Sequence, residues 1–319
     1  DLFMTLAFIF PGQGSQCVGM GQELAASFPA AAQVFEEVDE ALGENLSKLM
    51  FEGPEDTLTL TENAQPALMA VSLAVMRVLE SEGGIDLASP KSRIKFVAGH
   101  SLGEYSALAA AGTFSISDAA KLLKTRGRAM QEAVPVGEGA MAALLGLELD
   151  AASKVADQAS EGDICTAAND NASGQVVISG ARAAVERAME IAKEEGAKRC
   201  VLLPVSAPFH CALMAPAAEI MAEALAGVRM KQPAVPLIAN VTASDVNDAA
   251  EIRRLLVEQV TGMVRWRESV LFMKDKGVES LVEIGVGKVL SGLARRIDRD
   301  LSATNVGTPE DVAAFLQNI

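Results

Sequence analysis

The segment IKFVAGHSLGEYSALAAAG, residues 94–112, decides the fold prediction. Residues 94–98 form a largely apolar run that predicts a buried strand, and the Ala- and Leu-rich residues after Gly103 predict a helix. The residues between them match the G-x-S-x-G pattern of a nucleophile elbow, a strained turn that exposes its serine hydroxyl. Gly99 and Gly103 place no Cβ at the two ends of this sharp turn, where the backbone must pack closely. The N-terminus of the following helix directs its N–H groups and its positive dipole end at the group that the serine attacks. The segment therefore predicts Ser101 as a nucleophile; the alternative is a plain strand–helix turn that begins with a serine cap.

The bulk composition bounds the class of protein. The chain has 319 residues, 50% hydrophobic and 22% charged, which fits one large globular domain or a large and a small one. A net charge of −15 argues against a nucleic-acid-binding protein, whose footprint would be basic. No uncharged apolar run approaches about 18 residues, so no membrane span is expected. The cysteines form no C-x-x-C pair, which favours a reducing cytoplasm; they are Cys17, Cys165, Cys200 and Cys211.

A glycine-rich loop follows the first predicted strand. Residues 6–10, LAFIF, predict a buried strand, and PGQGSQ follows at residues 11–16. A phosphate-binding loop is one alternative, but the Lys-Ser/Thr pair of that motif is absent. Acyl transfer to a serine needs two N–H donors for the oxyanion. The Leu102 N–H is the natural first donor and the loop around Gln13 the second, although a simple turn explains the loop equally well.

The middle of the chain predicts a small inserted domain. From residue 135 the pattern becomes strand–helix–strand–strand–helix–strand, the ferredoxin-like order. We expect an insert over residues 137–206 in a large α/β domain made of residues 1–136 and 207–319. The expected strands of the insert are 140–147, 164–168, 175–179 and 198–205, and its helices are 151–160 and 181–196. In the large domain we expect further strands at 237–239 and 280–283, and helices at 22–42, 66–82, 117–133, 215–225, 249–260 and 266–276. A loop at 285–288 is expected to open one last helix.

The search for a base is short because the chain contains two histidines. A serine needs a base to take its proton. His100 adjoins Ser101, and neighbouring side chains in an extended turn diverge, so it is not expected to reach the hydroxyl. His210 follows the last strand of the insert, in the loop VSAPFH, and is the candidate base; a structural histidine is the alternative. No aspartate is singled out to orient it, so a backbone carbonyl or an amide could do so.

Arg126 stands on a largely apolar predicted helix, AAKLLKTRGRAM. An arginine there either pairs internally or faces a cavity. Its planar fork suits a carboxylate held through two hydrogen bonds. In a cavity, Arg126 would select an acyl group that bears a free acid.

These motifs together closely resemble the malonyl-CoA:acyl carrier protein transacylase family of fatty-acid synthesis. The resemblance covers nearly the whole chain and rests on several separate motifs in the same order: PGQGSQ (11–16), TENAQPAL (61–68), AGHSLGEY (98–105), RGRAMQEAVP (126–135), NDNASGQVVISG (169–180), PVSAPFHCALM (204–214) and EQVTGMVRW (258–266). It implies an acyltransferase with an α/β-hydrolase-like core and a ferredoxin-like insert. It also implies a malonyl-serine intermediate and no cofactor or metal beyond the coenzyme A thioester substrate.

The resemblance also implies roles for individual residues. Ser101 would be the nucleophile and His210 the base, with the carbonyl of Gln259 orienting His210. The N–H groups of Gln13 and Leu102 would form the oxyanion hole. The residues implied on the substrate side are Arg126 as the clamp on the malonyl carboxylate, with Gln65 and Asn171 nearby. Two departures from the family pattern, Met263 and Val286, replace common prolines and affect turn stiffness only. Phe209 beside His210 could crowd an α-substituent and so favour malonyl over methylmalonyl groups.

The expected partner, acyl carrier protein, is acidic, and so is this chain overall. Docking therefore needs a local basic patch. Lys198 and Arg199 near the last strand of the insert, together with Lys193, are candidates. Arg295 and Arg296 are rivals, and a solvated charged face is the alternative.

Three other functions remain open at this point. A serine esterase or lipase shares the elbow, but it should show an HGGG-type oxyanion loop, which is absent. A non-catalytic acyl-binding protein could keep the fold, although the serine and histidine argue against it. A transacylase of a polyketide pathway would differ in its carrier protein, which the sequence does not reveal.

Overall fold

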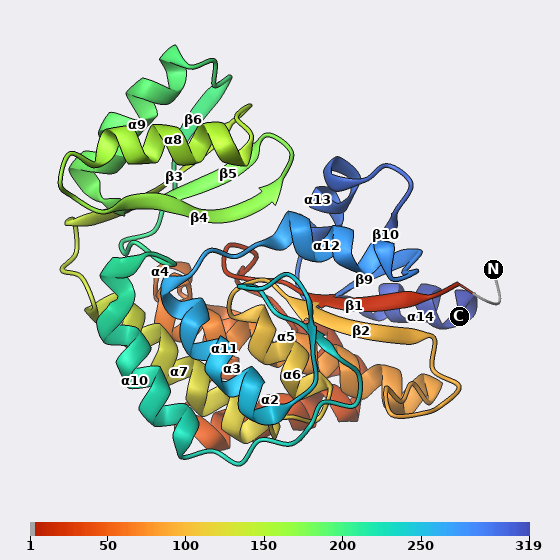
Figure 1. Cartoon of the computed structure of the whole chain (residues 1–319). Coiled ribbons are helices and arrows are strands. Elements are labelled where there is room, and N and C mark those ends of the chain that lie inside the picture. Colours follow the sequence, from red (N-terminus) through yellow and green to blue (C-terminus); the bar gives the residue numbers. More distant parts are fainter. Residues whose placement is uncertain (1–3) are drawn as a thin grey trace.

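The computed structural model describes residues 4–319, whose strands form two separate sheets. The larger sheet has the strand order β10-β9-β1-β2-β7-β8, and the smaller one has the order β4-β5-β3-β6. In Figure 1 the small sheet and its two helices stand above the larger body. The strands of the larger sheet are β1 (Leu6–Phe10), β2 (Ile94–Gly99), β7 (Leu237–Ile238), β8 (Asp245–Val246), β9 (Ser280–Ile284) and β10 (Ser302–Val306). Those of the smaller sheet are β3 (Gly139–Leu145), β4 (Cys165–Ala172), β5 (Gln175–Ala181) and β6 (Arg199–Leu202).

Strand β1 lies in the middle of the larger sheet and pairs in parallel with β2 and β9. All five of its residues are buried, as expected for a parallel strand covered on both faces. Alternate side chains enter different cores. Phe8 and Phe10 join the cluster with α5 (Thr61–Gly83) and α7 (Ile116–Glu132), whereas Ile9 packs with Trp266 of α12 (Trp266–Asp275) and Leu290 of α13 (Val289–Ile297).

The helices cover both faces of this sheet (Figure 1). The longest, α5, is buried almost all round, as its apolar sequence predicts. The helices of the larger body are α1 (Gln22–Ser27), α2 (Pro29–Leu42), α3 (Leu46–Glu52), α4 (Glu55–Thr59), α5 (Thr61–Gly83), α6 (Gly103–Ala110), α7 (Ile116–Glu132), η1 (Ala212–Met214), α10 (Ala215–Ala226), α11 (Ala249–Thr261), α12 (Trp266–Asp275), α13 (Val289–Ile297) and α14 (Pro309–Asn318). Those of the small sheet are α8 (Leu149–Ser160) and α9 (Arg182–Glu194).

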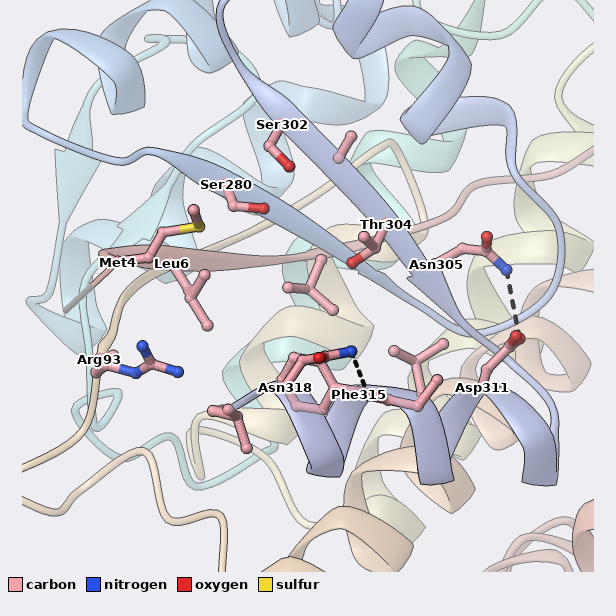
Figure 2. A pocket seen from close by; sticks show the side chains of 15 residues that line it. Met4, Leu6, Arg93, Ser280, Ser302, Thr304, Asn305, Asp311, Phe315 and Asn318 are labelled. Carbon is pink, nitrogen blue, oxygen red and sulfur yellow. Dashed lines mark hydrogen bonds between the residues drawn. The ribbon is translucent and has the colours of Figure 1, made fainter. Parts of the chain in front are cut away.

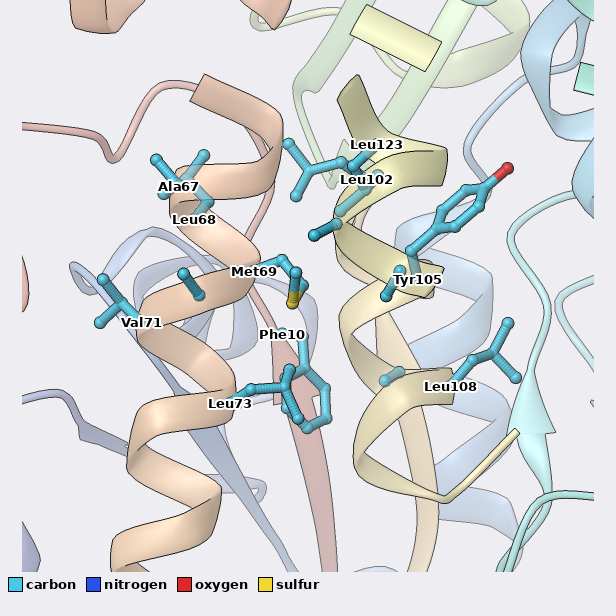
Figure 3. Packing of buried hydrophobic residues seen from close by; sticks show 14 of the residues in the cluster. Phe10, Ala67, Leu68, Met69, Val71, Leu73, Leu102, Tyr105, Leu108 and Leu123 are labelled. Carbon is cyan, nitrogen blue, oxygen red and sulfur yellow. The ribbon is translucent and has the colours of Figure 1, made fainter. Parts of the chain in front are cut away.

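The helix after the elbow is embedded in the core. Figure 3 shows Leu102 near Leu123, Met69 and Phe10 on one side of α6, and Tyr105 on the opposite side; all five belong to one buried cluster. Leu102 and Tyr105 are fully buried. This packing fixes the position of the start of α6 and, with it, the position of Ser101.

The small sheet has the ferredoxin-like order with antiparallel pairing throughout, so the predicted fold class is confirmed. It has its own apolar core under α8 and α9. The end of β4 reaches the larger body, where the Asp170 N–H donates to the Val264 carbonyl at 3.0 Å. The buried Asp170 carboxylate also accepts from Arg267 Nη2 at 2.9 Å. These contacts hold the small sheet over the carboxyl end of β2.

Several expected boundaries are wrong. The single helix expected over 22–42 is two helices, because Phe28, before Pro29, is extended at φ −134°. The helix expected from residue 117 begins at Ile116, and its cap is Ser115, whose side chain accepts from the Asp118 N–H. Strand β6 ends at Leu202, earlier than expected. The elements not expected from the sequence are α3, α4, η1, α14, β8 and β10.

Candidate active site

The backbone of the elbow is strained at the serine itself. Ser101 has φ 55°, in the left-handed region that costs a non-glycine residue about 1–3 kcal/mol. A Cβ at Gly99 would lie 1.8 Å from the carbonyl oxygen of Gly103, and one at Gly103 would lie 2.3 Å from that of Phe10. Both glycines are therefore required by close backbone contacts, and Ser101 Oγ is held at the carboxyl end of β2.

The structure brings Ser101 and His210 together from positions far apart in the chain. Ser101 Oγ lies 2.7 Å from His210 Nε2. His210 Nδ1 lies 2.9 Å from the carbonyl oxygen of Gln259 and 3.1 Å from that of Gly262. Because carbonyl oxygens only accept, Nδ1 carries the proton and Nε2 is left to accept from the serine hydroxyl. A backbone carbonyl thus occupies the position that an aspartate fills in other serine enzymes.

The surroundings of His210 keep its imidazole neutral. Burial, together with the nearby positive charge of Arg126, lowers the pKa of His210 to about 3. A neutral ring at physiological pH has a free lone pair on Nε2. His210 can therefore take a proton from Ser101 without first losing one.

Two backbone N–H groups near Ser101 are unused. Within residues 4–319, the N–H groups of Gln13 and Leu102 donate no hydrogen bond, whereas the Ser101 N–H donates to Asn240 Oδ1 at 2.9 Å. The loop of Gln13 packs tightly on the elbow, since a Cβ at Gly12 would lie 2.8 Å from the carbonyl oxygen of His100. Both residues line the cavity that contains Ser101. The two N–H groups are therefore available to an oxyanion.

Arg126 is 1% exposed, and its guanidinium group is held by neutral side chains. Nη1 donates to Gln65 Oε1 at 2.7 Å, and Nη2 donates to Gln259 Oε1 at 2.8 Å. Its Nε has no partner among residues 4–319 and no carboxylate there forms a salt bridge with it. Burial lowers the pKa of Arg126. A buried cation with amide partners and an unused N–H is suited to an incoming anion.

The site opens into a cavity of about 340 Å³ between the two sheets. Met141, Asn169 and Leu203 of the small sheet and its flanks form one wall. Phe209 is 8% exposed and lines the cavity beside His210. The wall residues are largely apolar, as in most small-molecule sites. The predicted site residues that line this cavity are Gln13, Gln65, Ser101, Leu102, Arg126, Phe209 and His210.

A larger cavity of about 610 Å³ lies elsewhere, between the outer strands β9 and β10 and helix α14. Figure 2 shows its polar residues, among them Arg93 and Asn318, with Asn305 hydrogen-bonded to Asp311. None of the predicted site residues lines it. We therefore take the cavity that contains the paired serine and histidine, and not the larger cavity, as the candidate active site.

Of the two residues expected near the bound substrate, Gln65 and Asn171, one lines the cavity and the other does not. Gln65 lines the cavity and contacts Arg126. Asn171 does not line it; its Oδ1 lies 2.8 Å from His100 Nε2, and Asn169 lines the cavity instead. Among residues 4–319, the imidazole that contacts Ser101 Oγ is that of His210, whereas His100 Nε2 contacts Asn171, in agreement with the divergence argument.

Three buried residues of the site were not singled out from the sequence: Asn169, Asn240 and Glu104. Asn240 follows a two-residue strand, which no pattern reveals. Glu104 belongs to the elbow segment, and burial raises its pKa to about 8. A carboxylate in the first turn of a helix is common enough that its burial could not be read from the sequence.

The basic candidates for docking lie outside the cavity. Lys198 and Arg199 are exposed at the start of β6. Lys193 pairs with Glu190 at 3.1 Å. Arg295 and Arg296 are exposed in the last turn of α13. The choice between the two patches stays a prediction.

Two searches of residues 4–319 gave negative results. No cluster of three or more His, Cys, Asp or Glu side chains could hold a metal ion. In the same residues, no helix combines the length and the apolar character needed to cross a bilayer.

Comparison with known proteins gives consistent matches over the full chain. The family described as "Acyl transferase domain" matches residues 7–306. The malonyl CoA-acyl carrier protein transacylase of Bacillus subtilis (strain 168) is 48% identical over 315 residues, covering 98% of this chain and 97% of the relative. Among solved structures, the acyl-carrier-protein-S-malonyltransferase from Bartonella henselae has a TM-score of 0.96 at 58% identity, covering 99% of each chain. A chain from a type II PKS acyl-carrier protein in complex with its malonyl-transacylase has a TM-score of 0.94 at 43% identity, covering 99% of this chain and 100% of that one.

Proposed function

The chain belongs to the acyl transferase domain family, and from this premise we propose how its residues move a malonyl group from malonyl-CoA to acyl carrier protein. The observation that carries the mechanism is the contact of 2.7 Å between Ser101 Oγ and His210 Nε2, beside the buried Arg126. A base-activated serine beside a cation suits the transfer of an acyl group that bears its own carboxylate.

In the first half-reaction, His210 Nε2 takes the proton from Ser101 Oγ, and Oγ attacks the thioester carbon of malonyl-CoA. The N–H groups of Leu102 and Gln13 receive the oxyanion of the tetrahedral intermediate. The intermediate collapses, the carbon–sulfur bond breaks, and His210 returns its proton to the departing thiolate of coenzyme A. The malonyl group is left on Ser101 as an ester.

In the second half-reaction, the phosphopantetheine thiol of acyl carrier protein takes the place of coenzyme A. His210 removes the thiol proton, and the sulfur attacks the malonyl-serine carbonyl through the same oxyanion site. Collapse of this intermediate transfers the malonyl group to the thiol and returns the proton to Ser101. One base and one oxyanion site therefore serve both steps of a ping-pong cycle.

Arg126 binds the malonyl carboxylate through its fork, and Gln65 holds the guanidinium in place. The support is that the hydrogen-bond partners of Arg126 are neutral, two glutamine amides and the Ser101 hydroxyl, and that its Nε has no partner among residues 4–319. Phe209 narrows the space next to His210 and so disfavours an α-methyl group. Asn171 acts on this site only through His100 and the loop around it, a weaker contribution than a direct contact.

Each of the two sheets belongs to a domain with its own role. We assign residues 1–136 and 207–319 to the catalytic domain and residues 137–206 to the insert that closes the cavity. The carrier protein docks on the exposed Lys198 and Arg199, at the edge of the insert. The reaction uses no cofactor besides the thioester substrate and takes place in the cytoplasm.

Covalent labelling tests this function. Incubation with radiolabelled malonyl-CoA should leave label on Ser101, and acyl carrier protein should remove it. Label that persists in Ser101→Ala would refute the assignment of the nucleophile. Release of free malonate without any thiol acceptor would instead favour a hydrolase. Carrier proteins of fatty-acid and polyketide synthesis, offered side by side to the labelled enzyme, would identify the preferred acceptor.

A further inference from the structure

Asn240 lies directly behind the nucleophile, after β7, and is completely buried. Its Nδ2 donates to the carbonyl oxygen of Gly99 at 2.7 Å, and its Oδ1 accepts from the N–H of Ser101 at 2.9 Å. One side-chain amide thus holds the backbone on both sides of the turn that carries the nucleophile. This is the pattern of two hydrogen bonds that a neighbouring strand would make, supplied here by one side chain.

The surrounding contacts fix the orientation of this amide. Gln259 Nε2 also donates to Asn240 Oδ1, at 3.1 Å, so the oxygen faces two N–H donors. The nitrogen faces the carbonyl of Gly99, which can only accept. A flipped amide would set donors against donors and an acceptor against an acceptor. The orientation therefore follows from the chemistry of its neighbours.

The same amide cluster reaches the base and the cation. Gln259 Nε2 donates to the carbonyl of Ser101 at 2.9 Å, and its Oε1 accepts from Arg126. Its backbone carbonyl accepts from His210. Asn240 is the member of this cluster that holds the two peptide groups of the turn itself.

These contacts matter because Ser101 is held in an unfavourable conformation. With φ at 55°, its backbone relaxes unless neighbouring groups hold it. A rotation of the turn would move Oγ away from His210 Nε2. By engaging the Ser101 N–H, Asn240 also leaves the Leu102 N–H as the unused donor of the turn.

We propose that Asn240 is a positioning residue that holds the Ser101 peptide in its strained conformation, so that Oγ faces His210 and the Leu102 N–H faces the oxyanion. This inference rests on the proposed role of Ser101. Asn240 contacts neither substrate nor the reacting oxygen; it acts through the backbone of the turn.

The test is the rate of Ser101 acylation in Asn240→Ala and Asn240→Asp, measured in single turnovers with malonyl-CoA and with a neutral fluorophosphonate. Misplacement of a reacting group by about 1 Å can cost roughly 100-fold in rate. We expect both rates to fall by about that factor, with the KM for malonyl-CoA unchanged. The matched control is Asn63→Ala, because Asn63 is a buried asparagine that donates to the carbonyl of Thr57 at 2.9 Å, away from the turn.

If the alanine variant does not fold, Asn240→Asp still allows the proposal to be tested. Its ionised carboxylate can accept from the Ser101 N–H but repels the Gly99 carbonyl, whereas the protonated acid can donate to that carbonyl. The titratable group in direct contact with residue 240 is Glu104, whose Oε2 accepts from the Asn240 N–H at 3.4 Å. Arg126 and His210 reach this position through Gln259, which contacts all three. Relative to wild type at each pH, the fluorophosphonate rate of Asn240→Asp should therefore rise as the pH falls.

Two results would overturn the inference. One is acylation within about tenfold of wild type in folded Asn240→Ala. The other is an Asn240→Asp rate whose ratio to wild type does not change with pH. Failure of the proposed function looks different, because the wild-type enzyme would then carry no label on Ser101.

Discussion

Arg126 Nη2 lies 3.2 Å from Ser101 Oγ, so a buried guanidinium contacts the atom that the base activates. In the unacylated enzyme the serine oxygen and two amides share this cation. In the proposed mechanism, the malonyl carboxylate binds this same guanidinium once Ser101 carries the acyl group. We therefore expect Arg126 to contact the serine oxygen in the resting enzyme and the malonyl carboxylate after acylation.

Arg126→Ala should lose malonyl transfer and gain tolerance for acetyl groups. Removing one member of a buried hydrogen-bonded charge pair costs about 2 kcal/mol or more, which corresponds to at least about 30-fold in kcat/KM for malonyl-CoA. Arg126→Lys keeps the charge but not the fork, and should recover only part of the loss. Parallel assays with malonyl-CoA and acetyl-CoA give the ratio. An unchanged malonyl-to-acetyl preference in Arg126→Ala would rule out the clamp.

Gly99→Ala should destabilise the protein and abolish acylation. A Cβ at Gly99 would lie 1.8 Å from the Gly103 carbonyl oxygen, and such overpacking costs about 1–3 kcal/mol or more. Urea denaturation measures the loss. Gly292→Ala in α13 is the matched control, because its Cβ meets no atom within 4 Å and helical alanine is favoured over glycine. Equal stability of the two variants would contradict the close contact at the elbow.

The acid limb of acylation should lie far below pH 6.5. Burial and Arg126 lower the pKa of His210 to about 3, so the base stays unprotonated in the folded enzyme from about pH 4 upward. The unfolded histidine binds a proton below about pH 6.5. The stability that follows from this difference is present above pH 6.5 and is lost as the pH falls toward 3. Single-turnover rates between pH 4.5 and 8 test the first expectation; a midpoint near 6.5 would contradict it.

Glu104 should make the protein less stable at alkaline pH. Burial is the main cause that raises its pKa, from 4.5 to about 8. The folded state therefore binds the proton more tightly than the unfolded state. The resulting stability is complete below about pH 4.5 and is lost as the pH rises through 8, a change on the order of a few kcal/mol. Glu104→Gln should flatten the decline of the unfolding free energy between pH 6 and 9, whereas Glu80→Gln on the exposed face of α5 should not.

Features of the site that depend on neighbouring residues can be predicted from the sequence, whereas those that depend on contacts between distant residues cannot. The elbow can be predicted from the sequence because Gly99, Ser101 and Gly103 lie within five residues, and the geometry of one turn explains why each residue type is needed there. The position of His210 beside Ser101 could be predicted because the chain contains two histidines. Asn240 was not found, since its importance depends on contacts with residues over 100 positions away and on a strand of two residues.

Irregularities within strands and helices are also difficult to predict from the sequence. The resemblance pointed to Asn171, but the irregular register of β4 turns Asn169 to the cavity instead. An alternation pattern cannot show a bulge that tertiary contacts impose. The break between α1 and α2 was in principle readable, because Pro29 restricts the residue before it.

Charge reversal at Lys198 and Arg199, as Lys198→Glu with Arg199→Glu, should raise the KM for acyl carrier protein by several-fold. Each exposed pair contributes about 0.2–1 kcal/mol, and reversal replaces attraction with repulsion toward an acidic partner. The first half-reaction with malonyl-CoA should be unchanged, since neither residue lines the cavity. Added salt should narrow the difference between variant and wild type.

The matched control reverses Arg295 and Arg296, which are equally exposed but lie in α13 of the larger body. If this second pair raises the KM and the first does not, the carrier protein docks on the larger body. If neither does, the acidic partner is recognised by contacts other than these charges, and the docking proposal is wrong. Because both variants keep the malonyl-serine step, a change in KM for the carrier protein reports docking and not chemistry.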